Sequence, residues 1–150
     1  MSTIEDTLNE IRSDLMVLPS VRMYEGVPEQ LGEWPAVVVA TMGGRSWLET
    51  HDGTIFTEHD VRVEIHVPRK NLGDASLGMT LLAEEAITLI YSGFVRDRYQ
   101  DTMVTTGDPR GANNASAPLD YAIGPSEWGG TQTYAFMCDF KVTRETRVEL

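Results

Sequence analysis

The feature that most constrains the fold is a long alternating segment, TIFTEHDVRVEIHVP, at residues 54–68. Its odd positions are mostly apolar and its even positions mostly polar, which is the pattern of a strand that buries one face. The thirteen residues 55–67 would span about 43 Å at roughly 3.3 Å each. A compact chain of 150 residues has a radius of gyration of only about 15 Å. We therefore expect this strand to extend beyond the body of the domain as one arm of a projecting hairpin, turning at Asp52-Gly53.

The histidines and acidic residues of this segment raise the question of a metal or acid–base site. His59 and His66 are seven positions apart, and an odd separation places them on opposite faces of a continuous strand. Glu64 and His66 share a face about 7 Å apart, but two ligands without a third do not make a metal site. We therefore interpret the segment as structural, with His59 at the edge of the core and His66 on the polar face.

The other segments predict both helices and strands. A helix is expected over 2–18, with an apolar stripe at helical spacing and Arg12 off that stripe, and a second, largely apolar helix over 71–94. PAVVVATM at 35–42 is apolar on both faces and indicates a strand covered on both sides. Further strands are expected at 20–25, 103–106 and 133–143, with a long loop at 107–120 and a charged tail at 144–150.

Together these segments predict an α+β fold in a single domain over 1–150. Its sheet is expected to be twisted and mainly antiparallel, with two main helices packed on it and one long projecting β-hairpin. The sequence contains neither internal repeats nor a linker that would separate a second domain.

Charge and composition narrow the classes of function. The net charge is −11, from 23 acidic and 12 basic residues, whereas proteins that bind nucleic acid through its phosphates need the opposite balance. The same sign disfavours anionic membranes, and no apolar run reaches the roughly 18 residues that a membrane span requires. The N-terminal residues do not resemble a secretory signal. The single cysteine, Cys138, fits a reducing compartment.

No residue pattern indicates catalysis or a cofactor. Cys138 lies between Phe136 and Phe140 on an aromatic strand face, where a buried thiol has a raised pKa and is inert. The two Gly-Gly pairs and GDPRG lack the spacing of phosphate-binding loops. Carboxylate pairs such as Glu84-Glu85 are most simply solvated, although an acid–base pair among them stays open as an alternative.

Surface for assembly is the stronger signal. Trp34, Trp47 and Trp128 fall in or beside expected loops, where each either caps its own core or anchors a protein interface, since aromatic residues are enriched there. The projecting hairpin and the long loop add edges to which a neighbouring subunit can bind. The residues predicted for a subunit or partner interface are Trp47, Asp52, Phe56, Arg110, Asn113 and Trp128.

The order of elements, from opening helix to last long strand, resembles the tail terminator (tail completion) proteins of long-tailed bacteriophages. The resemblance runs from Thr3 to about Thr146 and rests on three segments: LPSVRMYEGVPEQLGEWPAVVV, HDVRVEIHVPRKNLGDASLGMTLLAEEAITLI and YAFMCDFKVTRE. It implies a hexameric ring, without catalytic residues, that caps the tail tube and joins it to the head connector or stopper. The loop at 107–120 and the abundance of tryptophan depart from leaner members of the family.

The resemblance also implies partners and a location. The chain is expected in the virion, at the head-proximal end of the tail, after assembly in the host cytoplasm. Genomic DNA would pass through the ring without specific binding, past 6 × −11 = −66 formal charges. Two alternatives stay open: another head–tail connector or tail-tube-related subunit, and a small α+β enzyme or ligand-binding domain.

Overall fold

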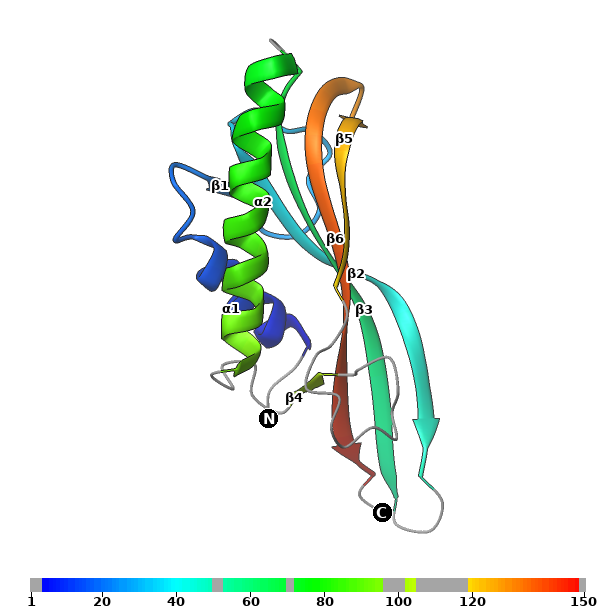
Figure 1. The fold of residues 1–150 in the computed structure, drawn as a ribbon. Helices are drawn as coiled ribbons and strands as arrows, with labels where there is room; N and C mark the ends of the chain where they lie inside the picture. The colour runs from blue at the N-terminus through cyan, green and yellow to red at the C-terminus, as the bar shows by residue number, and fades with distance from the viewer. Residues whose placement is uncertain (1–3, 50–52, 70–71, 96–101, 105–118, 149–150) are drawn as a thin grey trace.

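A computed structural model describes residues 4–49, 53–69, 72–95, 102–104 and 119–148 of the chain. Two helices lie on one side of a six-stranded sheet (Figure 1). The elements are α1 (Ile4–Leu15), β1 (Arg22–Met23), β2 (Ala36–Leu48), β3 (Thr54–Pro68), α2 (Leu72–Val95), β4 (Thr102–Val104), β5 (Asp120–Trp128) and β6 (Thr131–Arg147).

The sheet is mainly antiparallel, and the α+β expectation is confirmed. Its strands run in the order β1-β2-β3-β6-β4, and β5 also pairs with β6. Only β1 is parallel to its neighbour, and it meets β2 at just two residues, Ala36 and Val37. β5 and β4 pair with different halves of β6, at Thr131–Asp139 and Val142–Arg144 respectively.

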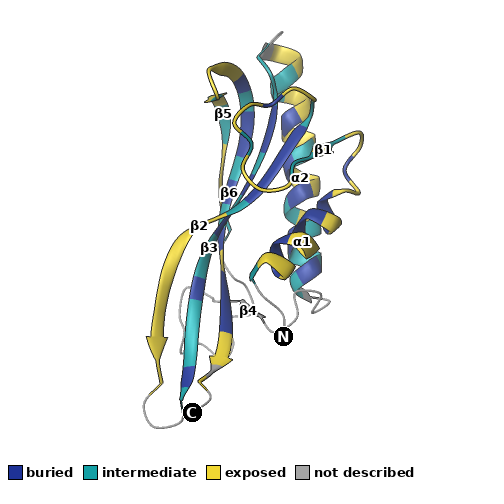
Figure 2. Cartoon of the chain, turned by 180° about the vertical axis from the view of Figure 1, so that it is seen from behind, coloured by how far each residue is buried: buried dark blue, intermediate teal, exposed yellow. Residues whose placement is uncertain are grey.

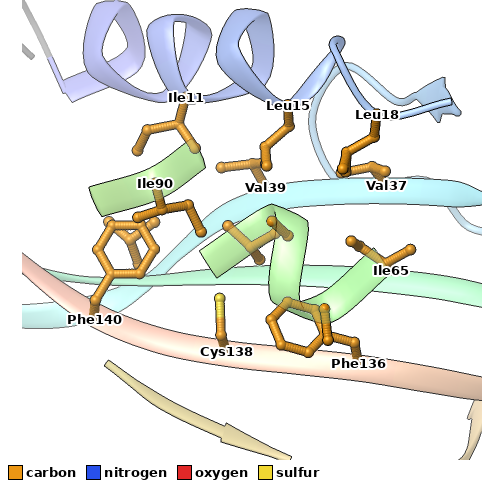
Figure 3. Packing of buried hydrophobic residues seen from close by; sticks show 14 of the residues in the cluster. Ile11, Leu15, Leu18, Val37, Val39, Ile65, Ile90, Phe136, Cys138 and Phe140 are labelled. Atoms are coloured by element: carbon orange, nitrogen blue, oxygen red, sulfur yellow. The ribbon is translucent and has the colours of Figure 1, made fainter. Parts of the chain in front are cut away.

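The main core lies between the helices and one face of the sheet. The alternation of β3 does not predict burial in the half that begins at Thr54, where Glu58 of the polar face is buried and Ile55 and His59 are only half-buried. Beside the helices it does, because the odd residues Val61, Val63 and Ile65 are fully buried. They meet α1 through Ile11 and Leu15, in a core that Figure 3 shows from close by. The other members of this cluster come from α1, α2, β2 and β6, and include Leu8, Val37, Val39, Met79, Ala83, Ala86, Ile90, Phe136, Cys138 and Phe140.

A second, smaller core covers the opposite face at the β1 end of the sheet. Ala36 and Val38 are buried against Leu31, with Tyr24, Trp34 and Trp128 packed around them. The prediction of a strand covered on both sides at 35–42 is confirmed for Ala36–Val39, which are buried on both faces. It is wrong for Thr41 and Met42, which are exposed because neither core extends that far along β2. The Tyr24 hydroxyl accepts backbone N–H groups of Gly32 and Glu33 at 3.0 and 3.3 Å and so holds the covering segment in place.

The far halves of β2, β3 and β6 run past the helices. We call this part the distal ribbon and define it as Thr41–Leu48, Thr54–Asp60 and Lys141–Arg147; Figures 1 and 2 show it extending away from α1 and α2. β2 and β3 are antiparallel there, Leu48 opposite Ile55, and the Glu49 N–H donates to the Thr54 carbonyl at 2.8 Å. Of the expected turn Asp52-Gly53, Asp52 lies outside the described residues, and Gly53 has a φ of +76°.

The C-terminal part of the sheet differs from the sequence prediction in two ways. The prediction of a charged tail at 144–150 is wrong for residues 144–147. These residues belong to β6, which pairs with β3 continuously from Thr133 to Arg147, so their backbone groups bond to β3. Strand β5 was not predicted, and Asp120, assigned to the loop, already belongs to it. Gly129 and Gly130, with φ of 55° and 84°, form the two-residue turn into β6. Residues 105–118 of the expected loop lie outside the described residues.

Candidate functional site

The distal ribbon has an open edge. Thr41–Leu48 are exposed along their whole length (Figure 2), and β1 pairs with β2 only at Ala36 and Val37. Among the described residues, no strand therefore pairs with the outer edge of this half of β2. A free edge presents a row of backbone N–H and C=O groups to which another chain can bind.

The opposite edge of the sheet is protected in a way that β2 is not. In the middle of β5, Pro125 lies opposite Tyr134 of β6. Because proline has no N–H, it fits a strand where the missing donor faces away from the paired neighbour. Pro125 therefore interrupts the outer edge of β5. The distal half of β2, TMGGRSWL, contains no proline and one charged residue.

An aromatic pair lies on the ribbon next to the open edge. Trp47 and Phe56 are directly opposite each other in the β2–β3 register, and their rings stack with centroids 5.7 Å apart. The Arg45 guanidinium lies 5.4 Å from the centroid of the Trp47 ring. Trp47 is still 38 % exposed, so a large side chain remains for contact with another protein. Trp and Arg are the residue types that most often dominate binding energy at interfaces.

The six residues predicted for an interface separate into three groups. Trp47 and Phe56 come together on the distal ribbon, as described. Trp128 is the last residue of β5 and lies outside the distal ribbon. Its indole N–H donates to the Pro28 carbonyl at 2.9 Å, and its ring meets His66 edge-on. It thus packs within its own chain. Asp52, Arg110 and Asn113 lie outside the described residues. Arg45 was missed, although its spacing of two from Trp47 places both on one strand face.

Ion pairs hold the three strands of the ribbon together. Lys141 Nζ lies 2.6 Å from Asp60 Oδ1, and this hydrogen bond is the main cause that raises the pKa of Lys141. Glu58 meets both Arg45 at 3.2 Å and Lys141 at 3.5 Å, and so links β2, β3 and β6. Exposed pairs each contribute little, but cross-strand pairs such as these favour one register.

Where the ribbon leaves the body, Arg62 and Asp139 join β3 to β6. The Arg62 guanidinium donates to both carboxylate oxygens of Asp139 at 2.8 and 3.2 Å, and this bonding raises the pKa of Arg62. The two residues are directly opposite in the register, so the pair fixes the strands at the base of the ribbon.

A bulge in β2 marks the base of the ribbon. The β2–β3 register shifts between Thr41 and Gly44, and a bulge of this kind bends and twists the strand that carries it. A Cβ at Gly44 would meet the backbone carbonyl of Glu58, so only glycine fits. The bulge leaves a hollow of about 310 Å³, whose lining includes Arg45, Glu58 and His59. The bend at this bulge directs the ribbon away from the plane of the rest of the sheet.

The two strand histidines lie on opposite faces, as predicted. His59 is half-buried, and its pKa is lowered, first by burial and then by the charge of Arg144. His66 is fully buried, which corrects the expectation of a polar-face residue. Its ring nitrogens contact Thr133 Oγ1 at 2.8 Å and Glu64 Oε1 at 3.2 Å. The described residues contain no group of three or more His, Cys, Asp or Glu side chains placed to hold a metal ion.

Two arginines expected at the surface are buried between α1 and the sheet. Arg12 donates to the Val39 carbonyl and to Glu5 Oε1, both at 2.8 Å. Arg144 donates to the Thr7 hydroxyl at 3.3 Å. The sequence placed Arg12 off the apolar stripe and Arg144 in a charged tail, and neither pattern predicted burial. Arg12 bonds to Val39 of β2 as well as to Glu5 of its own helix, and Arg144 meets Thr7 of α1. Arg144 belongs to the distal ribbon, so its contact with Thr7 ties the ribbon to α1.

Cys138 is a core residue, as expected. It is fully buried, and burial raises its pKa to about 12. No helix among the described residues is long and apolar enough to cross a membrane. Comparison with protein-family models and with curated proteins gives no match to this chain.

Proposed function

We propose that this chain is a tail terminator subunit of a long-tailed bacteriophage. Six copies form a ring that caps the tail tube and joins it to the head connector or stopper, with genomic DNA passing through the lumen. The ring belongs to the virion at the head-proximal end of the tail and is assembled in the host cytoplasm. The proposal makes the protein structural, with no reaction of its own.

The distal ribbon is the observation that carries the proposal. A strand edge of eight exposed residues, Thr41–Leu48, lies beside a stacked Trp47–Phe56 pair. Neither feature contributes to the cores that hold the domain together. A subunit that assembles with copies of itself needs such a surface, and long exposed edges are otherwise a risk for aggregation.

The charge of the chain agrees with a ring through which DNA passes. Six copies carry 6 × −11 = −66 formal charges. Where part of this charge faces the lumen, DNA phosphates are repelled from the wall and do not bind to it. A positive lumen in the assembled ring would contradict this part of the proposal.

Another connector or tube-related subunit is the nearest alternative. The same ribbon would serve it. The 24 residues of α2 argue against a stopper, because stoppers are mostly β-barrels.

Mass and shape in solution test the proposal. Light scattering after size exclusion should give 6 × 16.7 = 100.2 kDa, and negatively stained particles should be closed six-membered rings. Trp47→Ala should shift the protein to monomer with the circular dichroism spectrum of the folded chain, because Trp47 packs only on the ribbon surface. Val27→Asp, at an exposed residue outside the ribbon, is the control. A wild-type protein that stays monomeric at every concentration, or forms open fibres only, would contradict a ring.

A further inference from the structure

A second exposed apolar surface lies on α2. Leu77 and Leu81 are one helical turn apart and remain 67 % and 63 % exposed. Gly78 lies beside them, and a Cβ there would meet nothing within 4 Å. Glycine is unfavourable inside a helix, and no atom of the described residues lies close enough to require it at this position. We call Leu77, Gly78 and Leu81 the helix patch.

The surroundings of the helix patch suit a partner that is apolar and positively charged. Thr80 and Thr88 donate their hydroxyl groups to carbonyls of the preceding turn, at 3.0 and 2.9 Å, so these polar groups need no partner outside the helix. Asp74, Glu84 and Glu85 are exposed on the same helix. The sequence of α2 contains no Lys, Arg or His, so every charge that this helix carries is negative.

The ribbon offers the complementary surface. Arg45 lies over the exposed Trp47 ring, which in turn stacks on Phe56. We call these three residues the ribbon patch. It combines a large aromatic face with a guanidinium group, and such a group forms strong hydrogen bonds to carboxylates.

The two patches lie at opposite ends of the molecule. α2 begins at the end away from the ribbon (Figure 1), where Tyr134 and Ser76 are in contact at 3.5 Å. Tyr134 pairs with Val67, whereas Trp47 is opposite Phe56. Val67 lies eleven positions after Phe56 in β3, a distance of about 36 Å at roughly 3.3 Å per position. The two patches therefore meet only between different copies of the chain.

We propose that the ribbon patch of one copy packs on the helix patch of the next copy. Trp47 lies against Leu77 and Leu81, the absent side chain of Gly78 allows close approach, and Arg45 pairs with Glu84 or Glu85. This inference rests on the proposed function and identifies the two subunit surfaces of the ring. A contact between unlike surfaces is repeated from copy to copy and closes into a ring when the rotation fits.

Pairing of like surfaces is less favourable. Two helix patches face to face would bring Asp74, Glu84 and Glu85 against their own copies without a cation between them. Two ribbon patches would bring Arg45 towards Arg45. Opposite charges across an interface favour the correct partner, and like charges suppress the wrong one.

Substitution of the helix patch tests the contact. Leu81→Asp should raise the concentration needed for half-assembly, measured by sedimentation velocity, by about tenfold or more. Val17→Asp is the matched control, because Val17 is 67 % exposed, close to the 63 % of Leu81, but lies after α1. It should change that concentration by less than about twofold. Rings that tolerate Leu81→Asp, or that Val17→Asp disrupts equally, overturn the inference and leave the proposed function standing.

Exchange of charge and cross-linking test the pairing itself. Arg45→Glu and the double change Glu84→Arg, Glu85→Arg should each weaken assembly, and their combination should restore it at least partly. In a mixture of a Leu48→Cys chain with a Thr80→Cys chain, both at exposed residues next to the two patches, a short bismaleimide should join one copy of each. A Leu48→Cys chain mixed with a Val17→Cys chain should not be joined. Absence of the first product from assembled rings overturns the inference, whereas a chain that never assembles overturns the proposed function with it.

Discussion

Substituting Asp for Val63 tests whether the odd face of β3 holds the domain together. Val63 is fully buried, opposite Val39 on one side and Cys138 on the other. Loss of the buried valine surface costs about 1.5–3 kcal/mol, and an unpaired buried carboxylate adds about 3–5 kcal/mol. The sum approaches the entire stability of a typical domain, about 5–15 kcal/mol. We therefore expect Val63→Asp to be largely unfolded at pH 7.

The pH dependence of this variant separates its two costs. A penalty of about 3 kcal/mol on the charged form corresponds to about two pKa units, so the folded-state pKa of the new carboxyl rises from about 3.9 to about 6. Below pH 4 both states are protonated, and only the loss of apolar surface remains. The additional loss relative to wild type grows as the pH rises from about 4 to 6 and is constant above.

Urea unfolding at pH 4 and pH 7 measures both contributions. Val63→Ala removes apolar surface without a charge, so its difference from wild type should be the same at both values. Val27→Asp, at an exposed position, should stay within about 0.5 kcal/mol of wild type. Should Val63→Asp retain wild-type stability to within about 1 kcal/mol at pH 7, the assignment of this strand face to the core is wrong.

Three further predictions concern the bulge, the thiol and the half-buried histidine. Gly44→Ala puts a Cβ against the Glu58 carbonyl and should cost about 1–3 kcal/mol in urea unfolding, whereas Gly32→Ala, with open space at its Cβ, should be near neutral. Equal stabilities would mean that the bulge does not need glycine. Because burial raises the Cys138 pKa to about 12, iodoacetamide at pH 8 should modify it only in denaturant; rapid labelling of the folded protein contradicts this. The lowered pKa of His59 means that protonation favours the unfolded state, so the stability from this group is complete above its ordinary pKa of 6.5 and is lost as the pH falls below it. His59→Gln should make the free energy of unfolding depend less on pH below 6.5. An unchanged slope would mean that His59 does not cause this pH dependence.

The periodicity of the sequence was sufficient to predict buried residues where one face of a helix or strand meets the main core. The period of two in β3 predicted the burial of Val61, Val63 and Ile65 beside the helices, and the helical spacing in α1 predicted its contact with the sheet. β5 was missed because Gly124 and Pro125 lie at its centre, and both residues weaken a strand signal. β5 forms because its backbone pairs with β6 from Asp120 to Trp128, an interaction that the local sequence does not reveal.

Burial of polar residues was beyond local pattern because the covering groups are distant in the sequence. His66 is buried beside Trp128, 62 positions later, and Arg144 meets Thr7 across 137 positions. In the candidate site, Trp47 and Phe56 were among the predicted interface residues. The edge of β2 beside them is open because β1 pairs with β2 only at Ala36 and Val37. The sequence predicted a strand over 20–25, whereas only Arg22 and Met23 pair in the sheet.

The ribbon is built to hold its shape before any partner binds. An isolated two-stranded hairpin is marginally stable in water, and β6 adds the third strand along its full length. Ion pairs join the three strands through Glu58 and Lys141, and Arg144 connects the ribbon to α1. A surface that is already ordered loses less conformational entropy on association, so more of the contact energy remains as affinity. The ion pairs of the ribbon therefore act mainly by fixing the register of its three strands, which keeps the open edge and the aromatic pair in place for a partner.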